Sequence, residues 1–239
     1  MRVIVTRPLP QGDRTAAALA ACGHEPVLMP LTEIHPTDPG LLAGDPDVYA
    51  MVVATSASAL VHAPKTLTQA LRDVPFVGVG AATEHAALVC GFSDTESTTG
   101  NSSDLAAHVI AELPRGARVA YLCGRVRKPD LEEELSKAGL KIDAFETYDT
   151  VLVSYTTDFL REQFVTGTGQ AVLLYSRKAA QRLVDLLHGL HDPHNLESTS
   201  FFCLSADVAA PLKDAGFSAI GIAAEPTEAA LLDLLKSSR

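Results

Sequence analysis

Short runs of Val, Ile, Leu and Ala alternate with amphipathic segments along the whole chain of 239 residues. Apolar strands that alternate with helices are typical of parallel sheets covered by helices on both faces, so the pattern predicts an α/β fold. Strands are predicted at Val3–Thr6, Pro26–Met29, Met51–Thr55, Phe76–Gly80, Arg118–Cys123, Lys141–Phe145, Ala171–Tyr175, Phe201–Leu204 and Ala219–Ala223, and more weakly at Ser93–Ser97. Helices are predicted at Asp13–Ala21, Asp104–Leu113, Pro129–Ala138, Ala179–Leu187 and Thr227–Lys236.

The chain also repeats itself. The same order of strands, helices and glycines occurs twice, and short identities match between the two repeats, 116 residues apart in the first part of each repeat and 125 residues apart in the second part. The recurring pairs are Arg2-Val3 with Arg118-Val119, Gly23 with Gly139, Phe76-Val77 with Phe201-Phe202, and Gly91-Phe92-Ser93 with Gly216-Phe217-Ser218. The repetition predicts two similar domains.

Two extended, Thr-rich connectors, Leu31–Pro36 and Glu146–Val153, occupy equivalent places in the two repeats. If both are linkers (about 31–36 and 146–153), residues 37–146 form one domain by insertion. The other domain is then discontinuous and combines residues 1–34 with residues 152–239. This interpretation is preferred because it pairs two chain crossings in one hinge.

Composition narrows the class of partner. Hydrophobic residues make up 47% of the chain, charged residues 20% and aromatic residues 5%, tryptophan is absent, and the net charge is −10. An acidic chain without a long basic run or stacking aromatics is not expected to bind nucleic acid. The four cysteines are scattered singly, no leader precedes the first strand, and no apolar stretch could span a bilayer. We therefore expect a cytoplasmic protein without a membrane partner, and nothing requires more than a monomer.

Candidate chemistry gathers where predicted strands end. Ligands of open parallel sheets bind at the carboxyl ends of the strands, and the N-terminus of a following helix favours an anion. Basic side chains follow several of these ends, which in an acidic chain indicates a ligand that carries carboxylates or phosphates. Each hydroxyl could instead simply cap a helix. The candidate binding residues at these ends are Thr6, Arg7, Ser56, Gly80, Arg127, Ser176, Arg177 and Ser205, with further positive charge from Arg125, Lys128 and Lys178.

Two other motifs are weaker indications of function. Gly78, Gly80 and Thr83 begin like a dinucleotide fingerprint, but the third glycine is missing and no acidic residue ends a following strand. His188, His191 and His194 are evenly spaced, but Gly189 and Pro193 interrupt any common helix. We expect neither a cofactor nor a metal.

Several segments resemble, in order and spacing, the uroporphyrinogen-III synthase family, in its bacterial form. The resemblance covers nearly the whole chain. Each motif is weak by itself, so the resemblance rests on the order in which all of them occur. The matching segments are Val5-Thr6-Arg7-Pro8, Gly23-His24-Glu25-Pro26, Thr55-Ser56-Ala57-Ser58-Ala59, Val77–Thr83, Gly124–Leu131, Tyr148-Asp149-Thr150, Tyr175-Ser176-Arg177, Leu204–Ala209 and Pro226–Leu231.

The resemblance implies two flavodoxin-like domains joined by a two-stranded linker. It also implies a lyase of haem biosynthesis that uses no cofactor and closes hydroxymethylbilane, a linear tetrapyrrole, to uroporphyrinogen III with inversion of ring D and loss of water. Closure of two domains would shield the reactive cation from water. Whether the substrate is handed over by a transient contact with the preceding pathway enzyme stays open.

The resemblance also implies site residues. Tyr148, in the second linker segment, matches the family's best candidate for the catalytic acid, although a linker tyrosine could equally pack its ring between domains. A threonine implicated in the family falls at Val208 here, while the repeat partner of that position is Thr83, which joins the candidate binding residues. Two rival functions stay open: a cytosolic two-domain binding protein or sensor for a small anionic ligand, and a nucleotide-dependent transferase.

Overall fold

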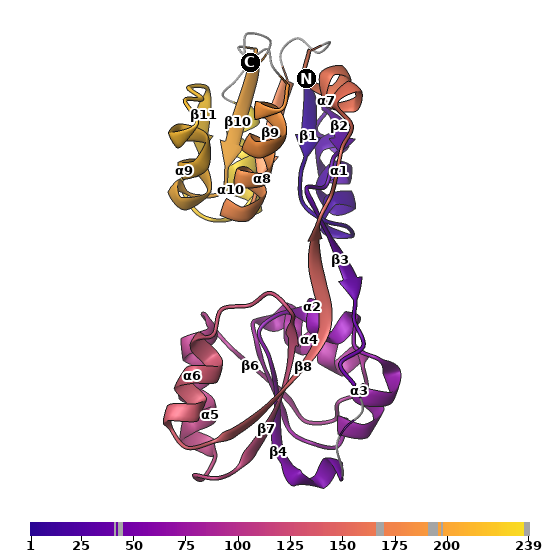
Figure 1. Cartoon of the computed structure of the whole chain (residues 1–239), viewed down its shortest axis with the longest axis vertical. Helices are drawn as coiled ribbons and strands as arrows, with labels where there is room; N and C mark the ends of the chain where they lie inside the picture. The colour runs from indigo at the N-terminus through magenta and orange to yellow at the C-terminus, as the bar shows by residue number, and fades with distance from the viewer. Residues whose placement is uncertain (41, 43–44, 166–169, 191–195, 197, 237–239) are drawn as a thin grey trace. The chain divides into compact units, whose positions relative to one another are not determined.

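The computed structural model describes the chain except for residues 41, 43–44, 166–169, 191–195, 197 and 237–239 (Figure 1). The chain forms two compact units. Unit 1 combines Met1–Glu33 with Val151–Arg239, and unit 2 is the inserted segment Ile34–Thr150. The chain therefore passes between the units inside the two connectors that the sequence singles out, 31–36 and 146–153.

Unit 1 is built on a five-stranded sheet in the order β11-β10-β9-β1-β2, with every neighbouring pair parallel. Numbered within the unit, this order is 2-1-3-4-5, the flavodoxin-like arrangement. The strands are β1 (Arg2–Val5), β2 (Glu25–Leu28), β9 (Gln170–Leu174), β10 (Thr199–Cys203) and β11 (Ile220–Ile222). The helices are α1 (Gln11–Ala21), α7 (Thr157–Val165), α8 (Arg177–His188), α9 (Ala206–Asp214) and α10 (Glu228–Asp233), followed by the 3-10 turn η3 (Leu234–Lys236).

Alternate residues of the central strands of unit 1 face opposite helical layers, as the twofold period of a strand requires. Ile4 packs into a core with side chains of α7, α8 and α9, whereas Val3 and Val5 pack into a second core with Leu19 of α1 and Leu231 of α10. All five side chains are at most 1% exposed. Burial on both faces explains why these strands have continuous apolar sequences.

Unit 2 has a six-stranded sheet in the order β3-β8-β7-β4-β5-β6, in which the pairs from β8 to β6 are parallel. Its strands are β3 (Thr32–Pro36), β4 (Tyr49–Ala54), β5 (Phe76–Val79), β6 (Thr95–Thr98), β7 (Arg118–Gly124) and β8 (Lys141–Leu152). Its helices are α2 (Ala57–Val61), α3 (Lys65–Leu71), α4 (Ala81–Val89), α5 (Ser102–Glu112) and α6 (Asp130–Lys137), with the 3-10 turn η1 (Pro46–Val48) before β4.

Two cores again sandwich the sheet of unit 2. Side chains of α2, α3 and α4 cover one face and meet strand residues such as Val52 and Leu122. Side chains of α5 and α6 cover the other face and meet Val53 and Tyr121. The alternation between neighbouring residues along β4 and β7 assigns each side chain to one layer, which fixes the register of the sheet.

The parallel strands of the two units have the same spatial order if β7 of unit 2 is taken as the equivalent of β1 in unit 1. In that reading β7, β8, β4, β5 and β6 correspond to β1, β2, β9, β10 and β11. Each unit thus combines the first part of one sequence repeat with the second part of the other. This exchange explains why Arg2-Val3 of β1 matches Arg118-Val119 of β7 while Phe76 of β5 matches Phe201 of β10.

The α/β class, the parallel sheets and all ten predicted strands are confirmed, including the weak one, which is β6. The largest difference concerns β8, predicted to end at Phe145 and observed to continue to Leu152. The second half of β8 extends past the apolar part of the sheet and lies beside the β3 segment, so its sequence loses the apolar pattern while its hydrogen bonding continues. The Thr37 amide, for example, donates to the Thr147 carbonyl at 3.0 Å. The predicted connector Leu31–Pro36 likewise contains β3.

Candidate functional site

A polar hollow of about 320 Å³ lies in unit 2 at the carboxyl ends of its strands. Residues at the ends of β4, β5 and β7 form its floor, and α5 and α6 begin at its rim. This is the edge at which parallel sheets bind ligands. The lining residues are Thr55, Val79, Asn101, Ser102, Tyr121, Gly124, Val126, Arg127, Lys128, Leu131 and Tyr148.

Tyr148 enters this hollow because the pairing of β7 with β8 is irregular. Cys123 pairs with Glu146, but the next residue, Gly124, pairs with Tyr148, so one residue of β8 is skipped. The skipped residue, Thr147, is fully buried and donates its hydroxyl hydrogen to the Ala59 carbonyl at 2.7 Å. A bulge of this kind redirects the following side chain, and here it brings the Tyr148 ring against the backbone of Gly124.

The Tyr148 phenol has polar and aromatic neighbours. Burial raises the pKa of the phenol, and a hydrogen bond with the Ser56 side chain opposes part of that shift. The His62 ring lies 6.3 Å from the Tyr148 ring, centroid to centroid, and burial lowers the pKa of His62. At neutral pH the phenol is therefore protonated and able to donate a hydrogen bond to a ligand.

Arg127 lines the same hollow but is already engaged. Its Nε donates to Glu132 at 2.7 Å, and its Nη1 donates to Glu146 at 3.0 Å and to the Gly124 carbonyl at 3.0 Å. The guanidinium lowers the pKa of the Glu146 carboxyl, chiefly through this hydrogen bond. Arg127 thus ties α6 and β8 to the end of β7.

Three further candidates of unit 2 lie at helix beginnings. Ser56 caps α2, with its hydroxyl accepting from the Ser58 amide at 3.3 Å. Gly80 precedes α4 with a φ of 76°, a left-handed conformation that favours glycine. Thr83, in the first turn of α4, is only 3% exposed, so its side chain packs inside the unit.

Four polar residues of this hollow were not selected as ligand-binding candidates from the sequence: Thr55, Asn101, Ser102 and Tyr121. Lys128 was named there only as additional positive charge after a strand end. Asn101 caps α5 by accepting from the Ser103 amide at 2.8 Å, and its capping box with Asp104 is recognisable in the sequence. Tyr121 is buried within β7, and its hydroxyl lies 3.3 Å from that of Thr55. No sequence signal distinguishes a core tyrosine from a pocket-lining one.

The candidates of unit 1 do not form one cluster. Arg7 stacks on the Tyr175 ring at 4.3 Å and pairs with Glu228 at 3.0 Å, and Thr15 and Tyr175 also donate to that carboxylate. Arg177 pairs with Asp207 at 2.9 Å, which connects the first turns of α8 and α9.

Two serine candidates of unit 1 cap helices. Ser176 caps α8 by accepting from the Ala179 amide at 3.2 Å, and Ser205 caps α9 by accepting from the Val208 amide at 3.4 Å. Val208, at the position where the family resemblance implies threonine, is 5% exposed and belongs to the core.

Thr6 holds two strands together. Its side chain is 1% exposed, and its hydroxyl donates to the Leu173 carbonyl at 2.6 Å, which joins β1 to β9. We expect Thr6→Val to lower the free energy of unfolding by about 1 kcal/mol, the usual loss for one hydrogen bond. Chemical denaturation measures this change. Because the hydroxyl is buried, substrate affinity is expected to stay at the wild-type value; weaker affinity with unchanged stability would contradict this assignment.

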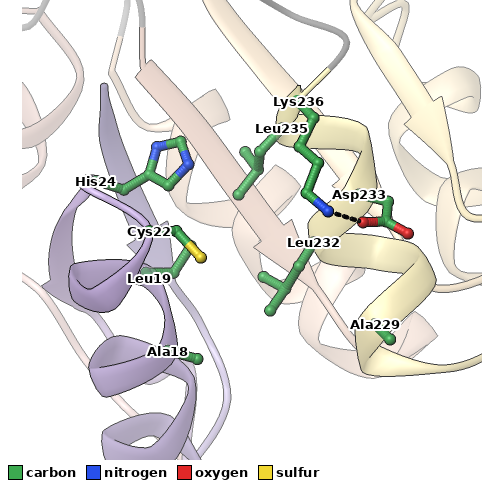
Figure 2. A pocket seen from close by; sticks show the side chains of 9 residues that line it. All are labelled: Ala18, Leu19, Cys22, His24, Ala229, Leu232, Asp233, Leu235 and Lys236. Carbon is green, nitrogen blue, oxygen red and sulfur yellow. Dashed lines mark hydrogen bonds and ion pairs between the residues drawn. The ribbon is translucent and has the colours of Figure 1, made fainter.

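A second hollow, of about 530 Å³, lies in unit 1 between α1 and the α10–η3 segment (Figure 2). Figure 2 shows Leu19 of α1 facing Leu232 and Leu235 across this hollow. Lys236 forms an ion pair with Asp233 at 2.6 Å. The hollow extends along α10 and η3 and includes Cys22 and His24, which lie between the end of α1 and the amino end of β2. Its lining is mainly apolar, and its lysine, Lys236, is already paired with Asp233, so the hollow of unit 2 is the better candidate site for an anionic ligand.

Two predictions concern features other than the hollows. Within the described ranges, no helix has the length and apolar character needed to cross a membrane. Of the three evenly spaced histidines, His188 ends α8, whereas His191 and His194 lie outside the described residues.

The fold and the site define a class: a duplicated α/β protein with two flavodoxin-like units and a polar pocket at the strand ends of the inserted one. The sequence profile described as "Uroporphyrinogen-III synthase HemD" matches residues 13–233, and the chain belongs to the uroporphyrinogen-III synthase family. The predicted resemblance is confirmed.

Solved structures agree on the fold. Uroporphyrinogen-III synthetase from Helicobacter pylori is 18% identical, with full coverage of both chains (100% each) and a TM-score of 0.65. A mutant uroporphyrinogen III synthase from the extremely thermophilic bacterium Thermus thermophilus is 17% identical, covering 100% of this chain and 98% of its own, with a TM-score of 0.56. No curated protein gives a match.

Proposed function

We propose that this chain catalyses the closure of hydroxymethylbilane to uroporphyrinogen III, as a cytoplasmic lyase that needs no cofactor. The observation that carries the proposal is the family match over residues 13–233, which includes every element of the unit 2 hollow. Membership of this family supports a role in haem biosynthesis. The substrate, the lyase class and the roles of individual residues are inferences from that membership and from the site.

The hollow suits the proposed substrate. Each pyrrole of the bilane carries acidic arms, which need hydrogen-bond donors and positive charge. The lining supplies hydroxyls, an asparagine at the start of α5 and two basic side chains. Its polar character distinguishes it from the mainly apolar hollow of unit 1.

Tyr148 is the proposed catalytic residue. A hydrogen bond from its phenol to the leaving hydroxyl of the bilane would stabilise the negative charge that develops as the carbon–oxygen bond breaks. The bilane also cyclises spontaneously to the isomer without inversion. The enzyme must therefore hold the substituted carbon of ring D near the azafulvene carbon, which is a task of proximity and orientation.

Product analysis tests the proposal. The purified chain is supplied with freshly prepared hydroxymethylbilane, the products are oxidised, and isomers I and III are separated by chromatography. We expect isomer III to predominate and to form faster than isomer I forms without protein. Isomer I alone, at the spontaneous rate, would contradict the proposed function; reversible binding of the bilane without turnover would favour the binding-protein alternative.

A further inference from the structure

The basic side chains around the unit 2 hollow differ in how far their charge is already neutralised. Arg127 contacts both Glu132 and Glu146, at 2.7 and 3.0 Å. Arg125 contacts Glu146 at 3.3 Å and Asp149 at 3.4 Å. Two guanidinium groups are thus matched by three carboxylates, and the arginines contribute no excess positive charge for a ligand.

Lys128 is different. It lines the hollow together with Tyr148, its side chain is exposed, and it has no hydrogen-bond or ion-pair partner among the residues that the structure describes. A lysine ammonium is a compact charge with three donors on a flexible stem, so it can reach a ligand without giving up an existing contact.

We propose that Lys128 binds a carboxylate of the substrate in the unit 2 hollow, whereas Arg127 holds the loop after β7 in place. The inference rests on the proposed function, because that function supplies a ligand with carboxylate arms. It replaces the expectation from sequence that Arg127 is the binding residue, since that expectation took no account of the partners that Arg127 has in the fold.

The energetic comparison favours the lysine. To bind a ligand carboxylate through Nε or Nη1, Arg127 would have to release Glu132 or Glu146, leaving that carboxylate without its partner. An existing bond would then be exchanged for a similar one with little net gain. Lys128 exchanges only water for the ligand, so it breaks no existing ion pair, and the loss of hydration is the only cost set against the attraction.

The same order occurs in unit 1. After β9, Arg177 pairs with Asp207 at 2.9 Å, and Lys178 follows it as an exposed side chain without a hydrogen-bond or ion-pair partner within the described ranges. An ion-paired arginine followed by a lysine without a partner among the described residues is thus found after one strand of each unit, but β9 corresponds to β4 of unit 2 and not to β7. The two positions are not equivalent, so the inference rests on Lys128 and the hollow that it lines.

The experiment compares Lys128→Gln with Arg127→Gln and with Lys65→Gln as a matched control. Lys65 begins α3, is exposed, and lies outside the hollow, so its substitution removes the same charge from the same unit. For each variant, the KM and kcat for hydroxymethylbilane are measured at several salt concentrations. Affinity for the oxidised product, a porphyrin with the same carboxylate arms, is measured by fluorescence, and the melting temperature by calorimetry.

We expect Lys128→Gln to raise KM and the dissociation constant of the porphyrin about fivefold, with kcat and melting temperature unchanged, and to flatten the rise of KM with salt. Lys128→Arg should restore affinity. Arg127→Gln should lower the melting temperature and change KM less than Lys128→Gln does. Lys65→Gln should match the wild type.

Two results would overturn the inference: equal affinities for Lys128→Gln and Lys65→Gln, or a larger loss of affinity for Arg127→Gln at an unchanged melting temperature. Failure of this inference is distinguishable from failure of the proposed function. If the wild type produces isomer III while Lys128→Gln binds normally, only the role of Lys128 is wrong. If the wild type neither produces isomer III nor binds the porphyrin, both proposals are wrong.

Discussion

Replacement of Tyr148 by phenylalanine is expected to lower kcat at least tenfold, equivalent to about 1.4 kcal/mol of activation free energy. The variant keeps the ring against Gly124 and loses only the hydroxyl group, together with its interaction with Ser56. If the phenol acts on the leaving hydroxyl, the loss should appear in kcat with little change in KM, because the contact is made mainly in the transition state. Steady-state kinetics with hydroxymethylbilane measures both constants.

Tyr155→Phe is the matched control. Tyr155 belongs to unit 1, its hydroxyl donates to the Pro30 carbonyl at 2.9 Å, and burial raises its pKa to about 12. Its replacement should lower stability by about 1 kcal/mol and leave kcat unchanged. Wild-type kcat in Tyr148→Phe would reduce Tyr148 to a packing residue.

The pH dependence gives a second test of Tyr148. Burial raises the pKa of the phenol above its ordinary value near 10. The raised pKa keeps the proton on Tyr148 throughout the neutral and mildly alkaline range, so deprotonation of this group should not reduce kcat between pH 7 and about pH 9. A fall in kcat in that range that is present in the wild type and absent from Tyr148→Phe would contradict a raised pKa.

The fold could be predicted from the sequence to a large extent because each strand of these parallel sheets is buried on both faces. Val3, Ile4 and Val5 are all fully buried, so β1 has the uninterrupted apolar run from which it was predicted. The repeat predicted two similar units. The insertion of residues 37–146, which implies an exchange of repeat halves between the units, was predicted from the two paired connectors. The strand order within each sheet depends on long-range pairing, which no local pattern records.

The candidate site was predictable only in part. Placing candidates at strand ends selected Arg127, and the family resemblance selected Tyr148; both line the unit 2 hollow. Their contacts were not predictable, because Glu146, which engages Arg127, is brought there by the pairing of β8 with β7. Thr6 shows the opposite limit: a threonine at a strand end resembles a ligand donor in sequence, but the fold buries its hydroxyl against a carbonyl.

The bulge between β7 and β8 is the clearest example of such a limit. A regular register would place Thr147 opposite Gly124, and the structure places Tyr148 there instead. A shift of one residue exchanges the two faces of a strand, so this single irregularity decides whether the phenol or the threonine hydroxyl meets the hollow. The sequence around Gly124 contains no local signal for it.

Gly124→Ala is therefore expected to be as damaging to turnover as the loss of the phenol itself, at least tenfold in kcat/KM. A Cβ atom at Gly124 would lie 2.7 Å from Cζ, 2.8 Å from Cε2 and 3.0 Å from the hydroxyl oxygen of Tyr148. Contacts this short force the ring to move, and overpacking of this kind costs about 1–3 kcal/mol of stability. Kinetics and thermal unfolding of the single variant measure the two effects.

The double variant Gly124→Ala with Tyr148→Phe shows whether the glycine acts through the phenol. If alanine impairs turnover by displacing the Tyr148 hydroxyl, its effect on kcat/KM should be much smaller in the Tyr148→Phe background than in the wild type, because the displaced group is already missing. Gly189→Ala is the control: among the residues that the structure describes, its Cβ would approach the Leu186 carbonyl at 3.3 Å, and Gly189 belongs to unit 1, outside the hollow of unit 2. Independent, additive effects of the two substitutions would show that Gly124 does not position the Tyr148 hydroxyl, even if each variant is impaired alone.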